Sequence, residues 1–414
     1  MNILIVGSGG REHAIAWKVA QNNAVKKVYC APGNGGTALE EKCDNINIQD
    51  VSSLADFAKK NNIDLTIVGP EVPLMEGIVD KFKALDLKIF GPTADGALLE
   101  GSKAYSKAFM EKYNVKTAAY EVFENKDEAF KFLKACQYPI VIKADGLAAG
   151  KGVVICEDYE EAENTVIDFM VKDVFKGSGK KLIIEEFLEG PEASILAITD
   201  GETILPFVSA KDHKQIYDGG KGPNTGGMGA ICPNPSCSPE VLEAFKKDIM
   251  EPTLTGLKGE NLDFAGIIFF GLMLTKKGPY LLEYNMRFGD PETQAVLPLM
   301  KSDLVELIYA AINKKLSQFK LCWNSGASCC VVAAAKGYPG KYNTGLEIKG
   351  MSKADRVFAA GVKYEEGILK TNGGRVLCTE ALGDTLEEAI NKAYKDLNHI
   401  SFEGIYYRKD IGRI

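Results

Sequence analysis

The chain has 414 residues, of which 46% are hydrophobic and 25% are charged, and this composition supports a globular protein of about three domains. Its net charge of -7 argues against nonspecific binding to nucleic acid or to an anionic membrane surface. No apolar run reaches the roughly 18 residues of a membrane span, and the strand-like start at Asn2 leaves no room for a signal peptide, so we expect a cytoplasmic protein.

The first predicted unit is a strand, a glycine loop and a helix, in the order typical of a doubly wound α/β domain. Backbone N–H groups of such a loop point at an anion. Glu12 replaces the third glycine of a dinucleotide fingerprint, and the second strand, 29–32, ends without a ribose-binding acid. We therefore predict that a single phosphate rests on Gly9, Gly10 and Arg11, beside the loop 33–37. His13 is interpreted as a packed helix residue rather than a catalyst.

A third parallel strand is predicted at 66–68, directly before Glu71. Ligands of such sheets lie beyond the carboxyl ends of the strands, so Glu71 is placed to hold a sugar hydroxyl. An acid at a helix start, stabilised by the helix dipole, is an equally good interpretation. The residues 95–113 are predicted to form one long helix that carries Lys103.

A polyphosphate cover is predicted where the strand 139–143 delivers Lys143 to the glycine-rich loop 144–154. Small residues admit phosphate oxygens to the backbone, and lysines match their charge. The loop is not a Walker A sequence, because Gly152 follows Lys151. A glycine hairpin with solvated lysines is the alternative. The apolar strand 181–188 contains two acids, a composition that suits a hinge for adenine.

Alternation along residues 281–288 separates a polar face from an apolar one. Glu283, Asn285 and Arg287 share the polar face. A carboxylate and an amide oxygen are hard ligands of the kind that Mg²⁺ accepts beside phosphate oxygens, and the arginine could clamp an anion against the metal. An amphipathic edge strand with a solvated polar face remains the alternative. The ten cysteines form no C-x-x-C pair, so a zinc site is not indicated.

These segments occur in the order found in ATP-grasp enzymes, and the chain is similar over its whole length to the phosphoribosylamine–glycine ligase family. The resemblance rests on several runs of residues, namely 7–14, 143–152, 222–229, 287–292 and 402–412. It implies an α/β fold in three parts. The parts are an N-terminal doubly wound (Rossmann-like) domain that binds phosphoribosylamine (1–103), an α+β ATP-grasp region (104–318) with a small mobile lid at about 121–190, and an α/β C-terminal domain (319–414).

The activity implied by the resemblance is ATP-dependent ligation of glycine to 5-phosphoribosylamine through glycyl phosphate. The products are glycinamide ribonucleotide, ADP and phosphate, in de novo purine biosynthesis. ATP would be a co-substrate and Mg²⁺ or Mn²⁺ the metal. A monomer or weak homodimer is expected, with small-molecule substrates and neither nucleic acid nor membrane as a partner.

The resemblance also assigns site residues by position. The metal ligands would be Glu283 and Asn285, and the ribosyl substrate would contact Gly9, Gly10, Arg11, Asn34 and Glu71. Asp212, Lys214, Arg287 and Asp290 would be catalytic. ATP would be bound by Lys103, Lys143, Gly146, Gly150, Lys151, Glu185, Glu186, Phe187, Leu188 and Glu192. Lys211, Gln215 and Gly220 depart from the family pattern, in which glutamine, arginine and aspartate are commoner.

Three other functions are weighed against this one. Another ATP-grasp ligase is disfavoured by the run 222–229 and by the opening glycine loop. A dinucleotide-dependent oxidoreductase is disfavoured by Glu12. A catalytically inactive nucleotide-binding regulator is disfavoured by the intact metal pair and by Lys103 and Lys143.

Overall fold

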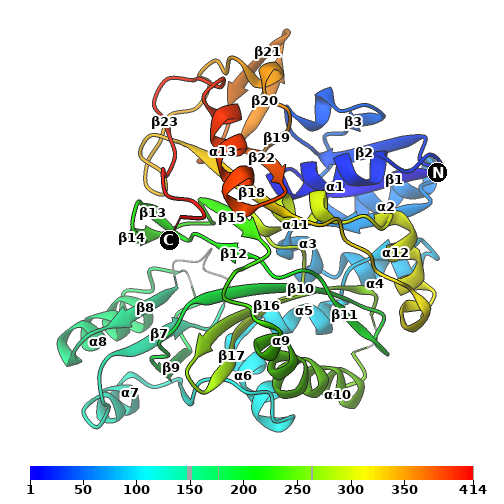
Figure 1. Cartoon of the computed structure of the whole chain (residues 1–414). Coiled ribbons are helices and arrows are strands. Elements are labelled where there is room, and N and C mark those ends of the chain that lie inside the picture. Colours follow the sequence, from blue (N-terminus) through cyan, green and yellow to red (C-terminus); the bar gives the residue numbers. More distant parts are fainter. Residues whose placement is uncertain (147–151, 176, 263, 414) are drawn as a thin grey trace.

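The computed structural model describes residues 1–146, 152–175, 177–262 and 264–413. Its strands form four larger sheets and two hairpins, and Figure 1 shows how the sheets are arranged. The N-terminal sheet and the C-terminal sheet lie in the upper part of this view, the central sheet crosses below them, and a smaller lobe projects at the lower left.

The N-terminal sheet is parallel and five-stranded, in the order β3-β2-β1-β4-β5. Its strands are β1 (Asn2–Gly7), β2 (Lys27–Pro32), β3 (Cys43–Asn45), β4 (Leu65–Val68) and β5 (Ile89–Phe90). The helix α1 (Gly10–Ala20) packs on one face. The other face is covered by α2 (Val51–Lys60), α3 (Glu71–Met75) and α4 (Ile78–Ala84). The predicted doubly wound arrangement is confirmed.

The central sheet is antiparallel and four-stranded, in the order β11-β10-β16-β17. Its strands are β10 (Glu192–Thr199), β11 (Ile204–Pro206), β16 (Gly266–Thr275) and β17 (Gly278–Asn285). One face packs on α5 (Ala94–Gly101), α6 (Lys103–Lys112), α9 (Pro239–Phe245), the π-helical turn Lys246–Met250 and α10 (Glu251–Gly259). The predicted single helix over 95–113 is wrong, because the chain breaks at Ser102, which caps α6.

The projecting lobe is an independent antiparallel sheet with its own apolar core, in the order β6-β9-β7-β8. It comprises β6 (Tyr120–Phe123), β7 (Ile140–Ala144), β8 (Val153–Cys156) and β9 (Leu182–Glu186), with α7 (Lys126–Leu133), α8 (Tyr159–Val166) and the π-helical turn Ile167–Val171. The central sheet and this lobe correspond to the expected ATP-grasp region.

The C-terminal sheet has the order β12-β15-β18-β22-β19, and β23 pairs with β18. Its strands are β12 (Lys211–Asp212), β15 (Gly229–Cys232), β18 (Ala327–Ala335), β19 (Val357–Ala359), β22 (Arg375–Gly383) and β23 (Ile405–Tyr406), and α13 (Leu386–Leu397) packs on it. Two of these strands, β12 and β15, come from the middle of the chain. A simple cut at residue 319 therefore does not separate the two sheets.

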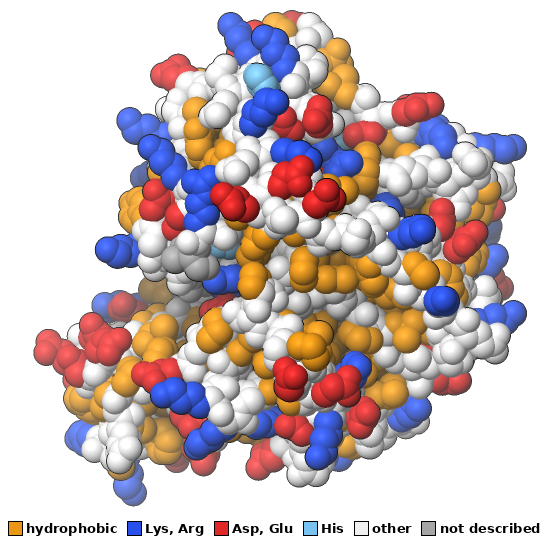
Figure 2. Space-filling view, in the orientation of Figure 1, with side chains coloured by type: hydrophobic (Ala, Val, Ile, Leu, Met, Phe, Trp, Pro, Cys, Tyr) orange, Lys and Arg blue, Asp and Glu red, His pale blue; other side chains and the backbone are white. Residues whose placement is uncertain are grey.

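The remaining elements connect these sheets. The hairpins are β13 (Gln215–Tyr217) with β14 (Lys221–Asn224), and β20 (Val362–Glu365) with β21 (Ile368–Thr371). The helices α11 (Glu292–Leu299) and α12 (Leu304–Ile312) share a core with α1, and short 3₁₀ turns occur at Thr37–Leu39, Leu316–Gln318 and Met351–Lys353. Figure 2 shows acidic and basic side chains interspersed over one face. Across the described residues, no helix is long and apolar enough to cross a membrane.

Candidate active site

The polar face of the central sheet forms the floor of the candidate site. Ser194 of β10 pairs with Gly271 of β16, which in turn pairs with Glu283 of β17, so the three residues lie in one row. Cross-strand partners project to the same face of a sheet. Gly271 contributes no side chain, and a Cβ there would lie 3.3 Å from Cγ of Glu283. The Glu283 side chain therefore packs directly over Gly271, where a larger residue would crowd it.

The predicted alternation is confirmed as far as Met286, but the prediction that Phe288 shares the face of Tyr284 and Met286 is wrong, because Phe288 lies beyond β17 and packs in a different core. Tyr284, Met286 and Phe288 are buried, with exposed fractions of 2%, 0% and 1%, whereas Glu283 and Asn285 are half-buried on the opposite face. Arg287 lies just beyond the end of the strand, and its Nη2 donates to Oδ1 of Asn285 at 3.2 Å. The three polar side chains thus remain together.

Two carboxylates hold Arg287 in place. Its Nη2 lies 3.0 Å from Oε1 of Glu100, and its Nε lies 3.4 Å from Oε2 of Glu71. Burial raises the pKa of Glu100. Burial also opposes ionisation of Glu71, but Arg287, Arg11 and a backbone hydrogen bond together outweigh it and lower the pKa of that carboxyl. Glu71 therefore faces an arginine, and Glu100 is a site residue that the sequence analysis missed.

Lysines surround the floor on the side of the projecting lobe. Burial opposes ionisation of Glu283, but Lys214, Lys143, Lys103 and Arg287 together lower its pKa. Lys214 Nζ pairs with Oε2 of Glu192 at 2.5 Å. Burial opposes the charge of Lys214, but Glu192 and Glu283 raise its pKa above the ordinary lysine value. Such a concentration of positive charge suits a polyphosphate.

Lys143 at the end of β7 meets Glu185 at the end of β9. Its Nζ lies 2.9 Å from Oε2 of Glu185, and Lys107 of α6 approaches the other oxygen at 3.3 Å. Burial lowers the pKa of Lys107 to about 8. The adjacent Glu186 is exposed, accepts from the backbone of Ala119 at 2.9 Å, and is followed by the half-buried Phe187 and Leu188.

The projecting lobe is tied to α6 at the same place. Nζ of Lys103 donates to the carbonyl of Gly146 at 3.1 Å, and Ser102 Oγ donates to Oδ1 of Asp145 at 3.0 Å. The predicted ATP-binding residues Gly150 and Lys151 lie outside the described residues. Lys103, Lys143 and Gly146 are thus brought together with Glu283.

A cleft of about 570 Å³ opens between the N-terminal sheet and the C-terminal sheet. Gly9 and Asn34 line it from one side and Arg375 lines it from the other, with Asp290 between the two walls. Nδ2 of Asn34 donates to Ser8 O at 2.8 Å and to Ala359 O at 2.8 Å, which joins the two sides.

Arg11 is turned away from this cleft. Its Nε pairs with Oε1 of Glu12 at 2.5 Å, its Nη1 donates to Phe288 O at 3.0 Å, and only 6% of the residue is exposed. Glu12 also accepts from the backbone of Gly9 at 2.5 Å. Gly10 packs against Gln294, whose Nε2 would lie 2.7 Å from an added Cβ. The cation that lines the cleft is therefore Arg375 of β22, which the sequence analysis did not single out.

Asp290 connects the cleft with the floor. Nη2 of Arg375 lies 3.0 Å from its Oδ2, and Nε2 of Gln294 donates to its Oδ1 at 2.7 Å. Burial opposes ionisation, but Arg375 and Arg11 lower the pKa of Asp290. The side chain therefore remains charged at the junction of the two regions.

The segment that contains Asp212 and Lys214 is braced by the C-terminal end of the chain. Nε2 of His213 accepts from the backbone of Gly412 at 3.1 Å, and Arg408 donates to the carbonyl of Gln215 at 2.9 Å. In Figure 1 the C-terminus lies beside the β13–β14 hairpin. Gly220 has φ +64°, a backbone conformation that favours glycine, which accounts for glycine at this position.

His13 is a packed residue, as predicted. It is 2% exposed, its Nδ1 accepts from the backbone of Ala359 at 2.8 Å, and its ring meets Phe358 edge-on at 5.6 Å between centroids. The side chain fastens α1 to β19.

The donor set of Glu283 and Asn285 fits a hard cation bound jointly with phosphate. Both side chains project from β17 on the same face, and Arg287 joins them through Oδ1 of Asn285. Among the described residues, no three His, Cys, Asp or Glu side chains gather to hold a metal by themselves. Mg²⁺ commonly takes one or two carboxylates and completes its shell with phosphate oxygens and water.

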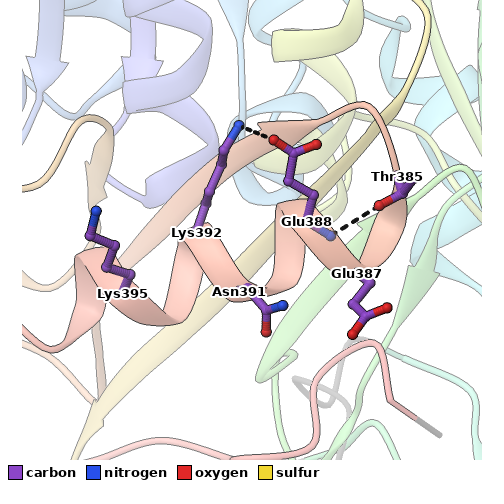
Figure 3. A pocket seen from close by; sticks show the side chains of 6 residues that line it. All are labelled: Thr385, Glu387, Glu388, Asn391, Lys392 and Lys395. Carbon is purple, nitrogen blue, oxygen red and sulfur yellow. Dashed lines mark hydrogen bonds and ion pairs between the residues drawn. The ribbon is translucent and has the colours of Figure 1, made fainter.

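A shallow depression of about 390 Å³ lies elsewhere, along the outer face of α13. Figure 3 shows its side chains rising from this one helix and its N-cap, with Lys392 turned to Glu388 at 2.7 Å. The charges pair along the helix and do not converge on a common point, so this surface is a solvated helix face.

Family models divide the chain into three consecutive parts. The N domain of phosphoribosylglycinamide synthetase matches residues 1–100, its ATP-grasp (A) domain matches 101–293, and its C domain matches 328–414. The chain belongs to the phosphoribosylglycinamide synthetase family. Its similarity to the family extends through the floor, the lysine cluster and the cleft.

Individual relatives agree with this family. The phosphoribosylamine–glycine ligase of Clostridium acetobutylicum is 68% identical over 100% of both chains. The solved structure of the Thermotoga maritima phosphoribosylamine–glycine ligase has a TM-score of 0.85 at 36% identity, and covers 99% of this chain and 100% of that one. The biotin carboxylase domain of the Hydrogenobacter thermophilus 2-oxoglutarate carboxylase shares the fold, with a TM-score of 0.73 at 16% identity over 98% of this chain and 91% of that one.

Proposed function

We propose that this chain joins glycine to 5-phosphoribosylamine with hydrolysis of ATP to ADP and phosphate, which yields glycinamide ribonucleotide in de novo purine biosynthesis. The chain is a carbon–nitrogen ligase of the phosphoribosylglycinamide synthetase family. The observation that carries the proposal is the position of Asp290 between two regions. Asp290 lines the cleft with Gly9, Asn34 and Arg375, and the charge of Arg287 acts both on Asp290 and on Glu283 of the floor.

ATP occupies the floor in this proposal. Lys143 and Lys103 approach its phosphates, while Glu186, Phe187 and Leu188 receive the adenine at the end of β9 and Glu192 faces the ribose. Glu283 and Asn285 would hold Mg²⁺ or Mn²⁺, which supplies charge neutralisation on the phosphates when bound. The charges of Lys143 and Lys103, which act on Glu283, support this placement.

The first chemical stage brings two anions together, because the carboxylate of glycine attacks the γ-phosphate. Arg287 and Lys214 offset this repulsion and stabilise the in-line transfer electrostatically. Glu71 and Glu100 fix the direction of the Arg287 guanidinium, at 3.4 and 3.0 Å. The resulting glycyl phosphate must be kept from water, and closure of the projecting lobe over the floor would exclude it.

The second stage forms the amide, as the 1-amino group of the ribosylamine attacks the carbonyl carbon and phosphate leaves. The ribosyl substrate lies in the cleft, with its 5-phosphate between the Gly9 loop and Arg375 and its amine toward Asp290. Arginine offers a planar pair of donors that matches a phosphate. The presence of Gly9, Asn34 and Arg375 in the lining of the cleft supports a phosphate site there. A cytoplasmic location and a monomer or weak homodimer remain predictions.

The decisive experiment measures ADP release by the purified chain with Mg²⁺, ATP, glycine and freshly generated 5-phosphoribosylamine, each omitted in turn. We expect release that requires both glycine and the amine, together with accumulation of glycinamide ribonucleotide. ADP release with a different pair of amino acid and amine would overturn the substrate assignment while retaining an ATP-dependent ligase.

A further inference from the structure

Two carboxyl groups approach each other at the junction of the floor and the cleft. Asp212 comes from β12, and Glu292 begins α11, directly after Pro291. The backbone of Gly227 lies against both segments, since a Cβ there would be 2.7 Å from Oδ1 of Asp212 and 2.3 Å from Cδ of Pro291. Asp212 and the start of α11 therefore lie on the same glycine, and the charge of Glu292 acts on Asp212 although the two acids are far apart in sequence.

Glu292 is buried, whereas Asp212 is half-buried with one of its carboxylate oxygens inside. Glu292 is 4% exposed, and Ser194 Oγ donates to its Oε1 at 3.2 Å. Oδ1 of Asp212 is buried without a hydrogen-bond partner among the described residues. An acceptor in this condition carries a large desolvation cost, so it is prepared to receive a proton from a reacting group.

The location of the pair matches the second chemical stage. On one side stand Lys214 and Glu192, which are paired at 2.5 Å beside the floor. On the other side stand Asp290 and Arg375, which are paired at 3.0 Å at the cleft. The amine has to pass from the cleft to the activated glycine across this junction.

We propose that Glu292, together with Asp212, accepts the proton that the ribosylamine loses when it attacks glycyl phosphate. This inference rests on the proposed function. The new bond joins the amine nitrogen to the carbonyl carbon, and the bond from that carbon to the phosphate oxygen breaks. Inorganic phosphate leaves with the bonding electron pair, and the proton on nitrogen moves to the ionised member of the carboxyl pair.

The surroundings of the pair favour proton uptake. Burial raises the pKa of Asp212 well above its ordinary value, and the charge of Glu292 raises it further. The charges of Lys214 and Arg375 act in the opposite direction but are outweighed. Burial raises the pKa of Glu292, and the charge of Asp290 raises it further. The charges of Lys214 and Arg287 lower it, but the net change is upward. Two adjacent acids in such a site titrate as a unit, and their shared proton affinity suits a general base.

The test separates the two stages of the reaction in the Glu292→Gln variant. Hydroxylamine is a strong nucleophile that traps glycyl phosphate as glycine hydroxamate, so it reports the first stage without the ribosylamine. Glutamine preserves the shape and the acceptor for Ser194. We expect hydroxamate formation to stay within about threefold of the parent chain, while amide formation with 5-phosphoribosylamine falls about 10²-fold or more.

Other outcomes would overturn the inference. An equal loss of both products, or a raised KM for glycine in the hydroxamate assay, would assign the pair to binding the amino group of glycine. Unchanged amide formation would remove Glu292 from the reaction. If the parent chain formed no glycine hydroxamate, the proposed function itself would fail, which is a different result.

Glu380 provides a matched control. It is also a buried glutamate, 1% exposed, that accepts from a serine, with Ser328 Oγ at 2.7 Å, and burial raises its pKa as well. It lies on β22 against Arg356, away from the floor. Glu380→Gln should leave both stages unchanged. Asp212→Asn provides the second test of the pair and should reproduce the selective loss of amide formation.

Discussion

The side chain of Glu283 lies among more positive than negative charge. Lys214, Lys143, Lys103 and Arg287 all act on it and lower its pKa. Its removal would leave these cations uncompensated, but it would not disturb the apolar face of β17, where Tyr284 and Met286 pack. Function and folding are therefore separable at this residue.

We expect Glu283→Ala or Asn285→Ala to reduce ligation by about 10²-fold or more, because the metal and the transferred phosphoryl group lose their hard ligand. ATP binding should persist on the lysines. Steady-state kinetics and nucleotide titration measure these quantities, and circular dichroism reports folding. The exposed Glu306→Gln is a control that should behave like the parent chain. Near-normal turnover in a folded Ala variant would contradict the metal assignment.

His213 gives the molecule a specific dependence on acid. Burial lowers its pKa to about 4, and the charges of Arg408 and Lys211 act in the same direction. The unfolded chain binds a proton at this residue below about pH 6.5, whereas the folded chain does so only near pH 4. The stability associated with neutral His213 is therefore present above pH 6.5 and is lost as the pH falls toward 4.

Replacing His213 with Gln should flatten this part of the stability profile by about 1.4 kcal/mol per pH unit. Urea unfolding between pH 7 and pH 4 measures the slope in the parent chain and in the variant. His399→Gln, at an exposed position, serves as the comparison. Identical slopes for parent and His213→Gln would show that folding does not shift the pKa of this imidazole.

At the scale of elements, the break between α5 and α6 places Lys103 at a helix start. Ser102 Oγ accepts from the backbone of Tyr105 at 3.1 Å, and Oδ1 of Asp145 accepts from the backbone of Ala104 at 2.7 Å. The helix cap thus joins the central region to the projecting lobe. The sequence analysis predicted one helix here, and Asp145, which completes the cap, is remote in the chain.

Ser102→Ala should reduce the free energy of unfolding by about 1 kcal/mol, because the start of α6 loses its cap. It should also raise the KM for ATP, because the backbone that positions Lys103 is then less firmly held. Thr385→Ala provides the matched control, since Thr385 caps α13 through the backbone of Glu388 at 3.2 Å (Figure 3). We expect a similar loss of stability there without a change in KM. Thermal unfolding and kinetics distinguish the two variants, and equal KM values for all three proteins would oppose the proposed role.

Elements with a clear local period were predictable, and contacts between elements were not. The alternation that groups Glu283 with Asn285 follows from strand geometry alone. Arg11, by contrast, follows the glycine loop as a phosphate-binding residue should, but the neighbouring Glu12 and the carbonyl of Phe288 hold it inside. No local sequence pattern marked Glu100 or Arg375 as a site residue, because each acquires its role from a partner that only folding brings close.

At the scale of the whole molecule, Asn34 joins the first and last parts of the chain. Its Nδ2 donates to carbonyls of Ser8 and Ala359, and its Oδ1 accepts from the backbone of Gly36 at 2.8 Å. The side chain also lines the cleft, so the geometry of the ribosyl pocket depends on this contact.

Asn34→Asp would replace the donor with an oxygen that faces carbonyl oxygens. We expect a loss of about 2–4 kcal/mol in the free energy of unfolding and a raised KM for 5-phosphoribosylamine, with a smaller change for ATP. The exposed Asn391→Asp on α13 carries the same chemical change and should alter neither quantity. If Asn34→Asp had the same KM values as the parent chain for both substrates, the contact made by Asn34 would not control the geometry of the cleft.

The sheet that receives β12 and β15 from the middle of the chain has a consequence for anyone who divides this protein into fragments. A piece that begins at residue 319 would contain β18 without β15, and the bare edge of β18 would invite pairing between copies. A soluble fragment would have to carry residues 211–232 as well, fused by a designed linker. Nascent chains face the same constraint, since this sheet is completed only after residues 233–326 have closed into a loop.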